Sequence, residues 1–136
     1  MDSRNTMNTF LMILGIVFLP YGLYCFAVPG YLADAAGVSA TTATGVVELR
    51  AMYGGLQAAF GVLLIAAARD SRFLLAGLAA VAFILPGLAS ARLLGVALGG
   101  DLSAYTIGAL IFEIGSSVIS LSLLRHQLSM TAHGAH

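Results

Sequence analysis

The stretch from Gly45 to Ala68 constrains this chain most, because it is long and apolar enough to cross a bilayer and yet carries charges. It reads G-V-V-E-L-R-A-M-Y-G-G-L-Q-A-A-F-G-V-L-L-I-A-A-A. About 20 apolar residues, rising about 1.5 Å each, span the hydrocarbon core of a membrane. An ionisable group inside such a segment costs about 2.5 to 3.5 kcal/mol on insertion scales. Glu48 and Arg50, and with them Gln57, are therefore expected to face a protein interior or a wet cavity.

Composition places the whole chain among integral membrane proteins. Of 136 residues, 60% are hydrophobic and only 9% are charged, whereas soluble domains carry about 25% charged residues. The formal net charge is zero and there is no lysine, so the chain lacks a basic patch and is not expected to bind nucleic acid. Cys25 is the only cysteine, which excludes an intramolecular disulfide and a cysteine metal cluster within one chain.

Hydropathy predicts an all-α integral membrane fold, an antiparallel bundle of four transmembrane helices that forms a single domain over residues 1–136. Pro20 and Pro86 fall inside two of the helices and are expected to kink them. Between the first two helices, a short interfacial helix near Leu32 is expected, with Thr42 or Thr44 capping the helix that follows. The expected helices cover residues of about 7–28, 45–68, 73–98 and 104–124, followed by a polar, partly disordered tail at 125–136.

The arginines on short connections predict the orientation. The first and third loops carry only Asp34 and Asp101 as charged residues. The side shared by the N-terminus, the middle loop and the C-terminus carries Arg4, Arg69, Arg72 and Arg125. Because short cytoplasmic segments are enriched in Lys and Arg, we expect a multi-pass protein of a cell inner (plasma) membrane with both termini in the cytoplasm.

Helical geometry gathers the polar residues of the second and fourth helices into stripes. At 100° per residue, Glu48 points about 200° away from Arg50 and so does not share its face. Small residues such as Gly54, Ala58 and Gly61 allow another helix to approach closely. One stripe comprises Arg50, Tyr53, Gly54, Gln57 and Gly61, and a second comprises Glu113, Ser116, Ser117 and Ser120.

The four charges inside the expected helices, Glu48, Arg50, Arg92 and Glu113, sum to zero. If both stripes face the bundle interior, Arg92 of the third helix lies between them. The sequence therefore predicts that Arg50, Arg92 and Glu113 meet in the outer half of the bundle, because exposing any of these charges to lipid costs free energy. It leaves the partner of Glu48 open.

The segment E-L-R-A-M-Y-G-G-L-Q, Glu48 to Gln57, is followed by Arg92 late in the third helix and Glu113 in the fourth. This pattern resembles a family of small bacterial four-helix membrane proteins known as a domain of unknown function, which is similar in turn to the DoxX-like membrane proteins. The resemblance implies a four-helix bundle. Some DoxX-like proteins act as membrane subunits of quinone or thiol redox systems, but no residue of this chain carries that role over.

Three interpretations of the function stay open. The preferred one is a cavity that binds a membrane lipid or another small amphipathic molecule. Its candidate ligand-binding residues are Arg50, Tyr53, Gln57, Arg92, Glu113, Tyr21 and Tyr24. The first alternative is an accessory or structural subunit of a larger membrane complex, or a homo-oligomer, in which the charges clamp helices together.

The second alternative is a membrane-embedded enzyme with Glu48 or Glu113 as a general acid or base. We favour a protein that is not an enzyme, and we expect no cofactor. No metal site is expected either, because His126, His133 and His136 all lie at or beyond the end of the last helix.

Overall fold

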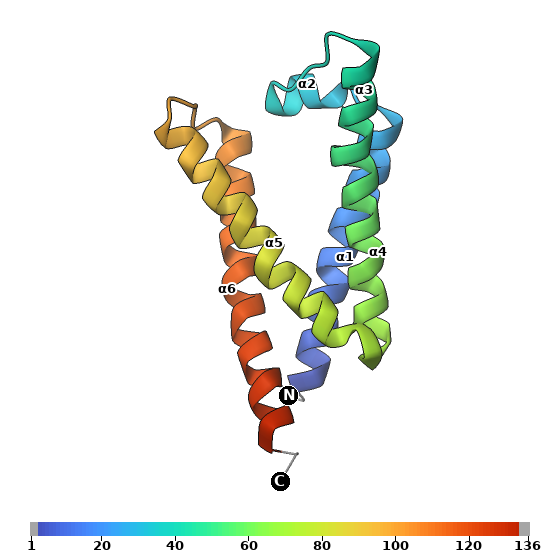
Figure 1. The fold of residues 1–136 in the computed structure, drawn as a ribbon, viewed down its shortest axis with the longest axis vertical. Coiled ribbons are helices and arrows are strands. Elements are labelled where there is room, and N and C mark those ends of the chain that lie inside the picture. The colour runs from blue at the N-terminus through green and yellow to red at the C-terminus, as the bar shows by residue number, and fades with distance from the viewer. Residues whose placement is uncertain (1–2, 134–136) are drawn as a thin grey trace. The chain divides into compact units, whose positions relative to one another are not determined.

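The computed structural model describes residues 3–133, and side chains as far as residue 129. It divides the chain into two compact units, residues 1–73 and 74–136, each of which is described by itself. The elements are α1 (Ser3–Ala27), α2 (Tyr31–Ala36), α3 (Ala43–Leu49), the π-helix η1 (Arg50–Gly55), α4 (Leu56–Arg69), α5 (Ser71–Ala97) and α6 (Ala104–His133) (Figure 1).

Within the described residues, four helical segments are long and apolar enough to cross a membrane. They are Ser3–Ala27, Ala43–Arg69, Ser71–Ala97 and Ala104–Ser129, between 25 and 27 residues long. The second of them joins α3, η1 and α4 into one run. The predicted all-α, four-helix membrane fold is thus confirmed, and α1 and α5 continue through Pro20 and Pro86 as single helices.

The end predicted for the fourth helix is wrong. Instead of giving way to a polar tail after residue 124, α6 continues to His133. The residues after Leu124 read R-H-Q-L-S-M, with neither proline nor glycine, so nothing in them stops a helix that has already formed. Polarity alone marked the end of the apolar run, not the end of the helix. Residues 134–136 lie outside the described part of the chain.

In unit 1, α1 packs along η1 and α4 (Figure 1), and glycines form the closest contacts between them. A Cβ placed on Gly54 would lie 2.7 Å from the Cβ of Phe26. A Cβ on Gly61 would collide with the backbone of Leu19, and one on Gly22 with the backbone of Ala58. These contacts confirm that small residues of the second helix admit a neighbouring helix. Close backbone approach replaces the hydrophobic drive that helices lack in lipid.

The second spanning helix is not a uniform α-helix. Over Arg50–Gly55 it widens into the π-helix η1, in which Leu56 donates its backbone N–H to the carbonyl of Ala51, five residues back. The constant turn of 100° per residue assumed from sequence is therefore wrong for this segment. A π-helical turn carries extra residues and is frequently found at functional sites.

The connection between α1 and α3 matches the predicted short helix and cap. Leu32 of α2 is fully buried, and the rings of Tyr24 and Tyr31 meet edge to face with their centroids 5.1 Å apart. Thr42 caps α3, accepting a hydrogen bond from the N–H of Gly45 at 3.1 Å. These contacts attach the connection to the end of α1.

In unit 2, α5 and α6 are joined by a turn that uses glycine and serine. Gly99 has a φ of 109°, a conformation that strains any residue with a Cβ. Ser103 begins α6 by accepting a hydrogen bond from the N–H of Thr106 at 3.2 Å. Further along, Ser120 donates its hydroxyl to the carbonyl of Leu78 at 2.9 Å, which ties α6 to α5.

Candidate functional site

Arg50 lies at the start of η1 and reaches the end of α1. Its Nε donates a hydrogen bond to the carbonyl of Phe26 at 3.2 Å. Because α1 ends at Ala27, this carbonyl belongs to the last turn, where carbonyls lack an intrahelical partner. The guanidinium also meets the negative end of the helix dipole. Arg50 is exposed, and its guanidinium group reaches the end of α1, one of the four candidate spanning helices.

The other candidates of the second spanning helix and of α1 differ in how deeply they are buried. Tyr53 and Gln57 are half-buried, whereas Glu48 is exposed. From α1, Tyr21 is half-buried and Tyr24 is exposed. Unit 1 therefore contains five of the seven candidate ligand-binding residues.

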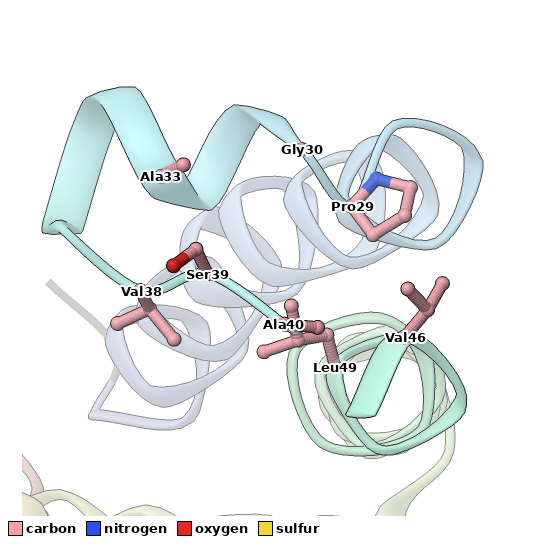
Figure 2. A pocket seen from close by; sticks show the side chains of 8 residues that line it. All are labelled: Pro29, Gly30, Ala33, Val38, Ser39, Ala40, Val46 and Leu49. Carbon is pink, nitrogen blue, oxygen red and sulfur yellow. The ribbon is translucent and has the colours of Figure 1, made fainter. Parts of the chain in front are cut away.

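A small pocket opens at the same end of unit 1 (Figure 2). Its volume is about 150 Å³. We call it the interfacial pocket; its lining residues are Pro29, Gly30, Ala33, Val38, Ser39, Ala40, Val46 and Leu49. Apart from the hydroxyl of Ser39, the side chains that line it are apolar. The pocket thus suits an apolar group.

The pocket and Arg50 are held by the same two segments of chain. Leu49 lines the pocket and immediately precedes Arg50. Phe26, which accepts the hydrogen bond from Arg50, lies three residues before the lining residue Pro29. The sequence did not single out this pocket, because its walls are small apolar residues of a connection whose path depends on how α2 packs.

In unit 2, Arg92 of α5 and Glu113 of α6 form a bidentate ion pair. Nη2 of Arg92 lies 2.8 Å from Oε1 of Glu113, and Nε lies 3.2 Å from Oε2. Glu113 is buried, with 6% of its side chain exposed, and the Arg92 side chain is 27% exposed. The guanidinium carbon of Arg92 also lies 5.8 Å from the ring centroid of Tyr105, within the range of a cation–π contact.

The polar stripe predicted on the fourth helix is buried as expected. Ser116, Ser117 and Ser120 are all buried in α6 together with Glu113. Ser117 donates its hydroxyl to the backbone carbonyl of Glu113 at 2.6 Å. Within unit 2, Glu113 and Ser120 therefore bond to α5, whereas Ser117 bonds within α6.

Of the three residues predicted to meet, Arg50, Arg92 and Glu113, the structure pairs Arg92 with Glu113. Arg50 belongs to the other unit, and its meeting with this pair stays a prediction. Among the described residues, no three His, Cys, Asp or Glu side chains gather as a metal ion would require. His126 is exposed on α6, while the side chains of His133 and His136 lie outside the described part.

The helices and the charges that they carry define a class of protein, a small multi-pass membrane protein with four spanning helices and intramembrane charged residues. Within that class, the chain belongs to the family described as a domain of unknown function (DUF4345), whose model matches residues 6–124. This match confirms the expected membership in a family of unknown function. No curated protein and no solved structure matches the chain.

Proposed function

We propose that unit 1 binds a small amphipathic or lipidic molecule, with its apolar part in the interfacial pocket and its polar part at Arg50. The observation that supports this is an apolar pocket of about 150 Å³ that is lined by Leu49, the chain neighbour of the exposed Arg50. A pocket with a few well-placed polar groups is the usual form of a small-molecule site. The candidates Tyr53 and Gln57, half-buried farther along the same run of helix, do not line this pocket.

Native mass spectrometry tests this proposal on the full chain released from its membrane without detergent. We expect a bound mass on the wild-type protein. Val46 lines the pocket, so Val46→Trp should fill it and remove that mass. Val62→Trp is the matched control, because Val62 is exposed on α4 and should leave the bound mass in place. A wild-type chain without any bound molecule would contradict the proposal.

For unit 2 a second candidate function, a structural clamp, is favoured by the bidentate pair. Both carboxylate oxygens of Glu113 accept hydrogen bonds from Arg92, so the pair neutralises itself without a ligand. A self-neutralised pair supports helix clamping more than it supports ligand anchoring or acid–base chemistry. We therefore assign the anchoring role to Arg50, and we propose that Arg92 and Glu113 hold α5 and α6 together.

We further propose that the protein lies in a cell inner (plasma) membrane with both termini in the cytoplasm, as the arginine bias indicates. The interfacial pocket would then open toward the outer leaflet. We also propose that the family of this chain is distantly related to the DoxX-like membrane proteins. An accessory role in a larger membrane complex remains the alternative if the chain copurifies with partner proteins.

A further inference from the structure

We infer that the molecule bound at the interfacial pocket is a small oxyanion amphiphile, an apolar group of about the size of a benzene ring joined to a carboxylate or phosphate that Arg50 holds. This inference deepens the proposed function and rests on it. It follows from two independent observations, the volume of the pocket and the bonding of Arg50.

The volume sets the size of the apolar group. Small-molecule sites usually measure about 300 to 1,000 Å³, and the interfacial pocket, at about 150 Å³, is well below that range. An engineered apolar cavity of about 150 Å³ in another protein takes up benzene. The interfacial pocket, which unlike that cavity is partly open, has room for a single ring or a short branched chain. It does not enclose a whole lipid, so the polar part of the molecule must lie outside it.

The bonding of Arg50 sets the charge of the polar part. Its Nε is used on the carbonyl of Phe26, while no described hydrogen bond or ion pair involves its two terminal nitrogens. The described ion pairs join Arg72 to Asp70 and Arg92 to Glu113. Terminal guanidinium nitrogens match the two oxygens of a carboxylate or phosphate. Arg50 is also the only Arg or Lys between residues 4 and 69.

Two carboxylates of unit 1 disfavour the binding of an anion. Glu48 and Asp34 are both exposed, and neither takes part in a described ion pair. The repulsion between exposed charges is about 1 kcal/mol at 4 Å in water, whereas a hydrogen bond to a charged group contributes about 1.5 to 3 kcal/mol. A contact at hydrogen-bond distance outweighs screened repulsion. We therefore expect the site to select an anion in spite of the two acidic residues.

Fluorine NMR on the full chain in phosphatidylcholine nanodiscs tests this inference, with empty nanodiscs to subtract partitioning into lipid. The probes are 4-fluorobenzoate, which is anionic, and 4-fluorobenzyl alcohol, which has the same ring and is neutral. Arg50→Gln should lower the affinity for 4-fluorobenzoate at least about tenfold, because it removes a charge-assisted contact. It should leave the affinity for the alcohol within about twofold of the wild type. Arg69→Gln, an exposed arginine at the far end of α4, should change neither.

The pocket variant separates this inference from the proposed function. Ala40 lines the pocket, and Ala40→Leu should abolish binding of both probes. If it changes neither, the pocket is not the site and the proposed function fails as well. If it abolishes binding but the wild type binds acid and alcohol equally, the site stands and the oxyanion assignment is wrong. Tighter binding of the larger 6-fluoro-2-naphthoate through the same site would overturn the size limit.

Two further arms cover the fold and the source of the oxyanion. If Arg50→Gln still binds the alcohol, the variant is folded. If it loses the alcohol as well, Arg50→Lys is tested and should retain part of the preference for the acid. Complete loss of that preference in Arg50→Lys would contradict the inference. Competition by inorganic phosphate would indicate a free anion. Competition by dihexanoyl phosphatidylglycerol but not by phosphate would indicate a lipid headgroup. Failure of both to displace 4-fluorobenzoate would overturn a phosphate as the ligand and leave a carboxylate.

Discussion

Arg92 and Glu113 meet in two parallel hydrogen bonds, so that an arginine on α5 and a glutamate on α6 neutralise each other inside unit 2. The pair is asymmetric, because 27% of the Arg92 side chain is exposed against 6% of that of Glu113. Removing one partner of a buried pair leaves an uncompensated charge, whereas replacing both with apolar residues is often tolerated. The difference between removing one partner and replacing both makes the clamp testable.

Arg92→Leu should lower the free energy of unfolding by about 3 kcal/mol, toward the lower end of the cost of breaking a buried pair because Arg92 is partly exposed. The double variant Arg92→Leu with Glu113→Leu should lose less than Arg92→Leu alone. Unfolding in detergent, followed by circular dichroism, measures the cycle. Strictly additive effects would show that the two side chains do not stabilise each other.

Two neighbouring glycines should respond oppositely to alanine. A Cβ on Gly54 would lie 2.7 Å from the Cβ and 2.9 Å from the Cα of Phe26, whereas one on Gly55 would meet only the carbonyl oxygen of Arg50, at 3.8 Å. Gly54→Ala should force α1 away and cost about 1 to 3 kcal/mol. Gly55→Ala should be neutral or stabilise the helix by up to about 1 kcal/mol. Thermal unfolding of the two variants compares them, and equal effects would refute close packing at Gly54.

Asp70, between α4 and α5, should stabilise the protein in a pH-dependent way. Arg72 donates side-chain and backbone hydrogen bonds to its carboxylate and thereby lowers the pKa of Asp70 below its ordinary value of 3.8. Since the folded pKa is depressed, the contribution to stability is present above pH 3.8 and is lost as the pH falls through the lowered pKa. Asp70→Ala should therefore reduce the melting temperature at pH 7.

The reduction in melting temperature caused by Asp70→Ala should become smaller below pH 3.8, because the wild type then loses the same interaction. Asp101→Ala is the control, because Asp101 is an exposed aspartate of another connection and should leave the melting temperature unchanged at both pH values. A loss of equal size at pH 7 and at the acidic end would show that the charge of Asp70 does not contribute.

The orientation is tested by labelling single cysteines in whole cells, in a Cys25→Ala background. Asp34 and Ser71 are both exposed and lie at opposite ends of the span Ala43–Arg69. With both termini in the cytoplasm, Asp34→Cys should react with a membrane-impermeant reagent from outside. Ser71→Cys should react only after the membrane is opened. The reverse pattern would overturn the orientation.

The sequence by itself determined the fold class and most of the polar candidates. Long apolar runs separated by short polar connections are sufficient to predict spanning helices, because lipid leaves the backbone no partners except its own. The cost of charge in lipid likewise predicted that Arg92 and Glu113 would need compensation. Small residues such as Gly61 predicted a close helix contact, because a residue without a side chain lets a neighbouring backbone approach. Each of these conclusions follows from the type of residue and the lipid around it, and none requires knowing which other segments of the chain lie nearby.

Only the tertiary structure decided which groups meet. A pattern read at 100° per residue does not reveal the π-helical turn at Arg50, because that turn arises from hydrogen bonds that reach five residues back, as from Leu56 to Ala51. The interfacial pocket depends on the path of the connection between α1 and α3. The partner of Arg50 is a backbone carbonyl, a group that every residue carries and that no sequence pattern marks. The continuation of α6 to His133 reflects helix propagation, which hydropathy does not measure.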